Sequence, residues 1–243
     1  MAAGEEALEL VAAAPTDPLR LESLAERRVA GEPLAWITGR AVFGDVVVRV
    51  DPGVYVPRWQ SLELARRGAS HLGRHGIAVD ACTGSGAVAA SLQRARSGAR
   101  VVATDDDPRA VACARANGVD ARLGHLLAPV PAALAGSVDV VVAVVPYVPA
   151  DALSLLPRDT LRFEDRRHYD GGPDGTALLR RLAAAAWPVL RPGGALLLEL
   201  GAGQEDVMAP ELGRLGYAAI ETWYDEEGDL RGIGARRPDE TGL

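Results

Sequence analysis

The stretch that most constrains the fold runs from residue 78 to residue 89 and reads Ala-Val-Asp-Ala-Cys-Thr-Gly-Ser-Gly-Ala-Val-Ala. An apolar run ends in an acid, turns through two glycines and enters an alanine-rich segment. Gly84 and Gly86 lack the Cβ atoms that would keep a ligand away from the backbone, and they tolerate positive φ angles. The pattern is typical of a buried strand that leads into a helix whose N-terminus faces a ligand.

A second apolar run favours a nucleotide-type ligand over a plain tight turn. Residues 100–105 are predicted to form the next strand, which ends at Asp105, nineteen residues after Gly86. A carboxylate at about this spacing meets the hydroxyl pair of a ribose in dinucleotide sites. Two cofactor classes fit this spacing, namely a nicotinamide or flavin dinucleotide and S-adenosylmethionine (SAM).

The rest of the chain alternates between predicted strands and predicted helices. The strands are expected at 77–80, 100–105, 119–123, 138–145 and 195–200, with two final strands at 218–224 and 230–236. The helices are expected at 86–97, 108–117, 176–189 and 203–215. This alternation predicts an α/β fold with a doubly wound parallel sheet, which binds ligands at the carboxyl ends of its strands.

Two further regions are distinct from this sheet. Residues 1–40 are predicted to be a short helical appendage, with helices at 5–14 and from Pro18 to about residue 30, ahead of a main domain at 41–243. The main domain is expected to open with strands at 46–50 and 54–59, joined by a turn at 51–53, and a helix at 60–73. The irregular stretch at about 148–174 is long enough to be a functional lid.

The composition limits the possible partners and compartments. The net charge of −7 over 243 residues argues against general binding to nucleic acid. No apolar run reaches the roughly 18 residues of a membrane helix, and no basic start marks a signal peptide, so we expect a cytoplasmic protein with no membrane or nucleic-acid partner. Cys82 and Cys113 are expected to be reduced. No metal is expected, because His71 and His75 share a helix face without a third ligand.

Several motifs stand in one order along the chain. They are Gly31-Glu32-Pro33-Leu34, Val50-Asp51-Pro52-Gly53-Val54-Tyr55-Val56-Pro57-Arg58, Asp80-x-Cys82-Thr83-Gly84-Ser85-Gly86, Asp105-x-Asp107-Pro108, Pro146-Tyr147-Val148-Pro149, Asp170-Gly171-Gly172 and Pro192-Gly193-Gly194-x-Leu196-x-x-Glu199. From about residue 19 to 236 the chain resembles the HemK/PrmC family of SAM-dependent protein-glutamine N5-methyltransferases. The resemblance implies a class I methyltransferase fold, Rossmann-like, with seven strands of which the last is antiparallel.

The resemblance also implies a set of cofactor residues for SAM, whose product is S-adenosylhomocysteine. Asp80, Gly84 and Gly86 would line the methionine and ribose side, Asp105 would accept from the ribose hydroxyls, and Tyr147 would stand beside the transferable methyl group. The full set of expected cofactor residues is Asp80, Thr83, Gly84, Ser85, Gly86, Asp105, Asp106, His125 and Val144. A dinucleotide oxidoreductase has no use for a Pro-Tyr turn after the fourth strand.

The chain departs from the family at the acceptor side. The family motif Asn-Pro-Pro-Tyr is replaced by Val144-Val145-Pro146-Tyr147, and Pro-Arg-Pro-Glu-Thr is replaced by Pro-Arg-Trp-Gln-Ser at 57–61. In the family, the Asn side chain accepts a hydrogen bond from the amide that is methylated, and valine offers neither donor nor acceptor. Losing the partner of a buried polar group costs about 1–3 kcal/mol. The substitution therefore disfavours glutamine as the acceptor.

An apolar, aromatic pocket would instead suit a flat electron-rich ring. The expected substrate-binding residues are Tyr55, Trp59, Val145, Pro146 and Tyr169, and the expected catalytic residues are Tyr147, Glu164 and His168, with Glu164 the first choice as proton acceptor. The specific hypothesis is C3-methylation of an indole in a tryptophan-derived small molecule, such as a tryptophan-containing cyclic dipeptide.

Other interpretations of the same residues stay open. One is a protein-glutamine methyltransferase that acts on a release factor or another protein despite the lost Asn, and another is a SAM-binding protein without catalysis. Trp36, Tyr55 and Trp59 have an alternative role in ordinary packing. Glu164 has an alternative role as a salt-bridge partner within the lid.

Overall fold

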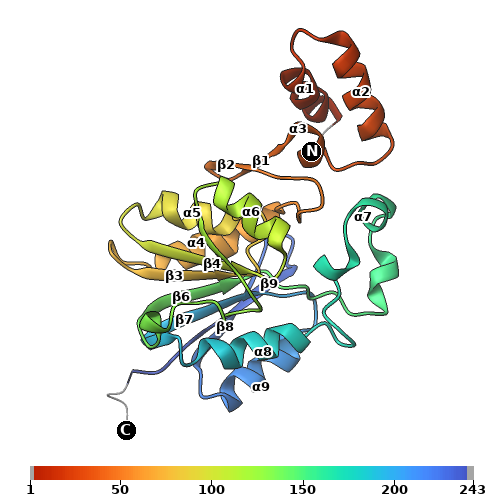
Figure 1. The fold of residues 1–243 in the computed structure, drawn as a ribbon. Coiled ribbons are helices and arrows are strands. Elements are labelled where there is room, and N and C mark those ends of the chain that lie inside the picture. The colour runs from red at the N-terminus through yellow and green to blue at the C-terminus, as the bar shows by residue number, and fades with distance from the viewer. Residues whose placement is uncertain (1–2, 240–243) are drawn as a thin grey trace.

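The computed structural model describes residues 3–239 and shows a seven-stranded sheet between two layers of helices (Figure 1). The strands are β3 Ile77–Ala81, β4 Arg100–Asp105, β5 Asp120–Leu123, β6 Val138–Ala143, β7 Leu190–Glu199, β8 Ala218–Tyr224 and β9 Leu230–Arg236. Their order across the sheet is β5-β4-β3-β6-β7-β9-β8, parallel from β5 to β7, with β9 antiparallel to both of its neighbours. The α/β class and the seven strands with an antiparallel last strand are confirmed.

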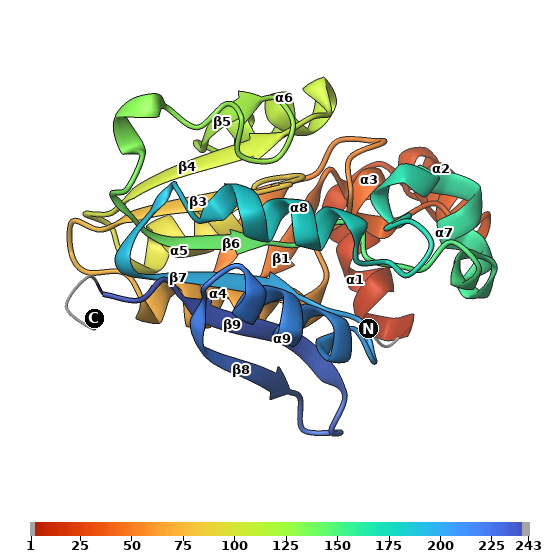
Figure 2. The ribbon, with the colours of Figure 1, turned by 90° about the horizontal axis from the view of Figure 1, so that it is seen from below.

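Both faces of the sheet are buried at its central strands, which explains their continuous apolar runs, whereas the edge strand β8 is largely exposed. In the central strand β6, Val140 and Val142 belong to one apolar core and Val141 and Ala143 to the other, all with 0% exposure. Helices α4 Leu62–Ser70, α5 Ala87–Ala95 and α6 Pro108–Ala116 cover the first face, and α8 Ala177–Ala186 and α9 Glu205–Arg214 cover the second. Figure 2 shows the two layers from below the view of Figure 1.

The turns that lead from strands into helices follow from their residues. Gly86 precedes α5 with φ +83°, a left-handed conformation that glycine adopts at little cost. Asp107 precedes α6 and its side chain accepts from the backbone N–H of Arg109, with Pro108 in the first turn. The predicted Asp-Pro helix start is therefore confirmed, and both turns open at the carboxyl edge of the sheet.

The N-terminal region folds as three helices with a small apolar cluster of their own. They are α1 Ala3–Ala13, α2 Pro18–Val29 and α3 Leu34–Thr38. The cluster consists of Leu10, Ala14, Leu24, Leu34 and Ile37. Figure 1 shows α1 and α2 standing away from the sheet. Trp36 ties α3 to the rest of the chain, because its buried indole N–H donates to the carbonyl of Val54 over 2.9 Å. The expected boundary at residue 40 remains a prediction, and residues 1–2 and 240–243 lie outside the described part.

The predicted strand at 54–59 is wrong. The two-stranded hairpin is formed instead by β1 Arg40–Phe43 and β2 Val46–Arg49, which turn at Gly44 rather than at 51–53. Val54 donates from its backbone to Asp51 in a turn, and its fully buried side chain packs with Ala110 and Cys113 of α6. The apolar residues after the turn thus serve packing rather than strand pairing, and a short 3-10 helix, η1 Trp59–Ser61, follows.

The lid segment, residues 148–174, is more ordered than an irregular loop. It contains η3 Ala152–Leu155, α7 Arg158–Phe163 and η4 Arg166–His168. Its two ends meet, because the N–H of Val148 donates to Tyr169 and the N–H of Gly171 donates to Val148. Arg162 of α7 donates to the carbonyl of Ala30, directly after α2, and Figure 1 shows α7 below the end of α2.

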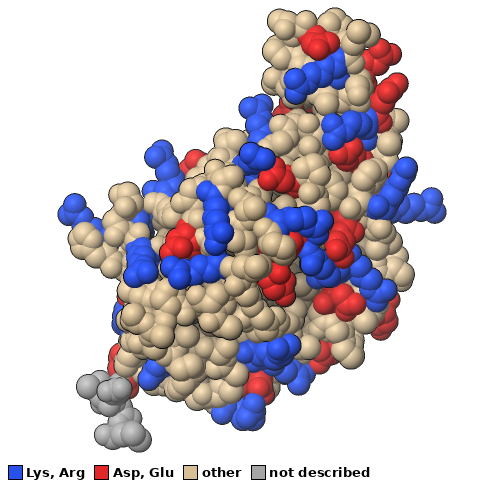
Figure 3. Space-filling model, in the orientation of Figure 1, with Lys and Arg blue, Asp and Glu red and all other residues tan. Residues whose placement is uncertain are grey.

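The connection between β5 and β6 carries a short 3-10 helix, η2 Ala132–Leu134. On the face drawn in Figure 3, acidic and basic side chains are interspersed. Among residues 3–239, none of the helices has the length and apolarity needed to cross a membrane.

Candidate active site

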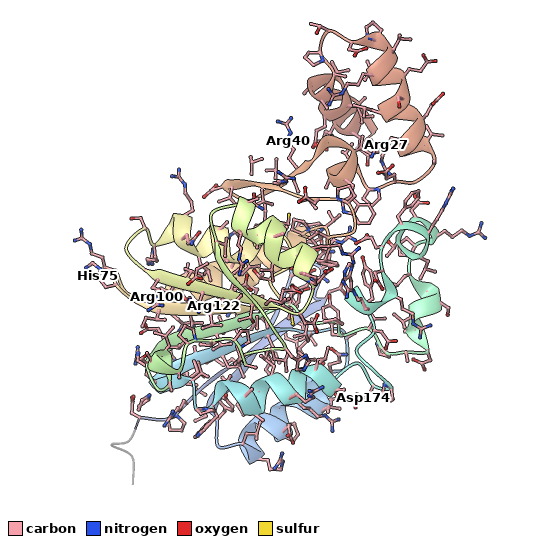
Figure 4. All side chains as sticks on the ribbon, viewed as in Figure 1. Arg27, Arg40, His75, Arg100, Arg122 and Asp174 are labelled. Atoms are coloured by element: carbon pink, nitrogen blue, oxygen red, sulfur yellow. The ribbon has the colours of Figure 1, made fainter. Side chains whose placement is uncertain are left out.

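A cavity of about 530 Å³ opens at the carboxyl ends of the central strands. In Figure 4, His75 and Arg100 mark the amino ends of β3 and β4, on the opposite side of the molecule from α7 and Asp174. The cavity is lined by Tyr55, Cys82, Gly84, Asp105, Asp106, Asp107, Ala110, His125, Leu126, Val144, Val145, Pro146, Tyr147, Val148, Leu156, Arg167, His168, Tyr169 and Leu178. This is the place where parallel α/β sheets bind ligands.

One end of the cavity is lined by a group of carboxylates. Asp105, at the end of β4, accepts from the backbone N–H of Gly84 and from that of Asp107, each over 2.9 Å. Burial raises the pKa of Asp105. The neighbouring Asp106 lies 3.5 Å from Nδ1 of His125, and both line the cavity. A fixed carboxylate beside a glycine turn fits the hydroxyl pair of an adenosine ribose, so these residues suit SAM.

Four of the expected cofactor residues stand behind this wall rather than on it. Asp80 is 2% exposed and accepts from the hydroxyl of Thr83 over 2.6 Å and from the N–H of Ala89 over 3.1 Å. Burial raises its pKa to about 7. Ser85 is also buried, and a Cβ at Gly86 would lie 3.0 Å from that of Ala114. Asp80, Thr83, Ser85 and Gly86 thus shape the turn from within.

The other end of the cavity is aromatic. The ring of Tyr55 meets that of His168 at 6.1 Å and that of Tyr169 at 5.7 Å, both edge to face. Val144 and Val145 continue the wall after β6. The structure therefore brings together the expected Tyr55, Val144, Val145, Pro146, Tyr147, His168 and Tyr169.

Glu164 lies outside the lining of the cavity. Its side chain is 3% exposed, and Oε1 accepts from Nη2 of Arg58 over 2.5 Å. The same Arg58 nitrogen donates to the hydroxyl of Tyr169 over 2.8 Å, and the guanidinium lies 5.3 Å from the centre of the Tyr55 ring. Glu164 is therefore a salt-bridge partner, as the alternative interpretation of this residue expected, although Arg58 lies outside the lid segment. Through Arg58, the salt bridge also helps to hold the rings of Tyr55 and Tyr169.

Trp59 also lies outside the cavity lining. Its side chain is 62% exposed, and the guanidinium of Arg231 lies 5.6 Å from the centre of its ring. His168 does face the cavity, but its Nδ1 is buried without a hydrogen-bond partner among the described residues, and burial lowers the pKa of the ring. A neutral ring at neutral pH follows from that shift.

Several lining residues were missed by sequence reasoning. Cys82 was expected only to be reduced, yet it adopts φ +57° and lines the cavity. Arg167 reaches from η4 across to the carboxylate of Asp107, sixty residues away in sequence, and both line the cavity. The apolar Ala110, Leu126, Val148, Leu156 and Leu178 complete the lining. Cys82, Asp107 and Val148 stand within the motifs of the chain, whereas the other residues named here carry no local signal.

Solved structures place the fold among SAM-dependent methyltransferases. A ribosomal protein L11 methylase from Lactobacillus delbrueckii has a TM-score of 0.55 at 20% identity, covering 79% of this chain and 85% of that one. A 16S rRNA methyltransferase of T. thermophilus, in complex with SAM and guanosine, has a TM-score of 0.57 at 20% identity, covering 84% of this chain and 46% of that one. These likenesses concern the fold alone.

Curated relatives share much more sequence, although no family model matches the chain. Release factor glutamine methyltransferases are 40% identical in Moorella thermoacetica, 37% in Mycolicibacterium smegmatis and 32% in Geobacter sulfurreducens. These alignments cover 79%, 73% and 91% of this chain, and 70%, 65% and 79% of the respective relatives. The chain is a SAM-dependent methyltransferase with SAM as its cofactor, and it belongs to the release factor glutamine methyltransferase (HemK/PrmC) family.

Proposed function

We propose that this chain methylates the side-chain amide nitrogen of a glutamine in a protein acceptor, with a release factor as the first candidate. The proposal rests on the Pro146-Tyr147 turn, which lines the same cavity as Gly84 and Asp105. It is supported by the 40% identity of the aligned part of this chain to a release factor glutamine methyltransferase. This reverses the expectation drawn from Val144, because the curated relatives act on protein glutamine by name and support no small-molecule acceptor.

In such a transfer, the residues of the chain have to hold the cofactor, align the amide with its methyl group and exclude water. Asp105 and the Gly84 turn hold the cofactor, whose sulfonium supplies the methyl group. Tyr55, Tyr147 and Tyr169 enclose the other end of the cavity, where the amide has to be aligned and water excluded. The amide nitrogen forms a bond to the methyl carbon, the bond from that carbon to sulfur breaks with its electron pair left on sulfur, and the nitrogen releases a proton to solvent.

A second candidate function is supported by a specific observation. Three rings, Tyr55, His168 and Tyr169, meet edge to face beside the apolar Val144 and Val145. Such a lining suits a flat aromatic acceptor such as the indole of a tryptophan-containing cyclic dipeptide. This candidate rests on the lining alone.

A transfer assay with isotope-labelled SAM separates the two candidates. One arm contains a purified bacterial release factor, and the other contains tryptophan-containing cyclic dipeptides and simple indoles. The proposal predicts label in the release factor, on one glutamine located by peptide mass, and loss of that label when this glutamine is replaced by glutamate. Label in the indole arm alone would refute the glutamine proposal in favour of the second candidate.

A further inference from the structure

Tyr147 is held from three sides although it stands in a connection rather than in a helix or strand. Its hydroxyl donates to Oε1 of Glu199 over 3.0 Å, and its backbone carbonyl accepts from Nε2 of Gln204 over 2.7 Å. Its ring lies against Gly201, where a Cβ would sit 3.4 Å from the ring atom Cδ2. The position of this cavity-lining ring is therefore determined by contacts from β7 and from the turn before α9.

Glu199 is an unusual partner because it is a buried carboxylate whose two oxygens are both held by hydroxyl groups. It is the last residue of β7, is 3% exposed, and its second oxygen accepts from the hydroxyl of Ser61 over 2.6 Å. The nearby Arg231 pairs with Asp225, although its charge also lowers the pKa of Glu199. Burying a carboxylate is costly even when hydroxyl groups donate to it, and burial raises the pKa of Glu199. A cost of this kind is typical of functional sites.

The direction of the hydrogen bond has a chemical consequence. Because the hydroxyl proton of Tyr147 points to Glu199, the phenol oxygen has only lone pairs left for another partner. The carboxylate also polarises that oxygen, which strengthens it as an acceptor. In the same wall, Val144 has no polar atom in its side chain to accept from an incoming N–H.

We propose that Glu199 is a positioning residue that orients the Tyr147 hydroxyl to accept a hydrogen bond from the N–H group of the methyl acceptor. This inference rests on the proposed function, since a glutamine amide carries such a group. It supplies the acceptor oxygen that Val144 does not offer. Holding one N–H of the amide leaves its nitrogen turned toward the methyl group, which is the alignment that transfer requires.

Two variants test the proposal, each with a matched control. Glu199→Gln keeps the size of the side chain but removes the charge, and Tyr147→Phe keeps the ring but removes the hydroxyl. Glu226→Gln and Tyr224→Phe make the same changes at exposed positions outside the cavity lining. The measurements are kcat and KM, the Kd of SAM by calorimetry, the melting temperature, and the Kd of the acceptor on protein loaded with S-adenosylhomocysteine.

The proposal predicts a selective pattern. Both test variants lose about tenfold or more in kcat, since one lost hydrogen bond of about 1.4 kcal/mol corresponds to tenfold. The Kd of the acceptor rises while the Kd of SAM stays within about twofold, and the double variant is no worse than Tyr147→Phe, because the two residues act as a unit. Wild-type kcat in Glu199→Gln beside a defective Tyr147→Phe would overturn the role of Glu199.

The failure of this inference differs from the failure of the proposed function. If the release factor is methylated equally by the wild type and both test variants, the proposed function stands and the inference is wrong. If the release factor is not methylated, but an indole is and both variants lose that turnover, the proposed function is wrong and the role of Glu199 stands, because an indole also carries an N–H.

Discussion

Replacing Val144 by asparagine is expected to change turnover in opposite directions for the two candidate acceptors. Val144 is partly buried in the cavity wall, directly after the β6 strand. With a glutamine acceptor, the new side-chain oxygen can accept from the amide, and a net gain of about 0.5–1.5 kcal/mol per hydrogen bond raises kcat/KM by roughly twofold to tenfold. With an aromatic acceptor, the new amide is left without a partner, and a cost of about 1–3 kcal/mol lowers kcat/KM by roughly fivefold to more than a hundredfold.

The assay is initial-rate methyl transfer with both acceptor classes, using Val144→Asn, the wild type and the control Val42→Asn, whose position on β1 is 69% exposed. The Kd of SAM is measured for all three proteins, so that a change in cofactor binding is not mistaken for a change in acceptor alignment. A tenfold loss of glutamine methylation in Val144→Asn, at unchanged Kd of SAM, would refute the reasoning that this wall position governs how the amide is held.

Three further results are expected. Arg167→Ala removes the ion pair that joins the lid segment to Asp107. Stopped-flow measurements should then show SAM dissociating about threefold to tenfold faster. An unchanged rate would contradict the idea that this ion pair helps the lid segment close over SAM. The pKa of Asp80 is about 7 in the folded chain, which is above its unfolded value. The folded state therefore binds more protons, and the free energy of unfolding falls as pH rises from about 4 to 7, by at most about 4 kcal/mol. In Asp80→Asn, the melting temperature should depend less on pH over this range. Trp36→Phe removes the buried hydrogen bond to Val54 and should lower the free energy of unfolding by about 1 kcal/mol in urea denaturation.

The sheet could be predicted from sequence because its signals are local. The central strands β3, β4 and β6 are short apolar runs with turn signals at their ends, and the Gly84 turn and Asp105 mark the ligand edge by spacing alone. The strand expected at 54–59 failed because β-branched and aromatic residues also occur where a connection packs under a helix, as Val54 does beneath α6. Periodicity alone does not separate these two uses of apolar residues.

The acceptor side of the cavity was less predictable because it depends on contacts between distant segments. Glu164 was the first choice as proton acceptor, but its partner Arg58 lies 106 residues earlier and holds it outside the cavity lining. Glu199 received no role from the sequence, since its link to Tyr147 exists only once β6 and β7 are side by side. Tertiary contacts of this kind leave no local pattern in the sequence.

The closed ends of the lid segment have a consequence for how acceptor choice can change. Val148 and the backbone around Tyr169 and Gly171 are joined by hydrogen bonds, so the chain enters and leaves the lid segment at nearly the same point. A loop with adjacent ends can change in length or sequence at little entropic cost to the rest of the fold. The lid segment can therefore change in sequence without changes in the sheet. The proposed cofactor end of the cavity cannot, because it is built from the ends of strands that are hydrogen-bonded to one another.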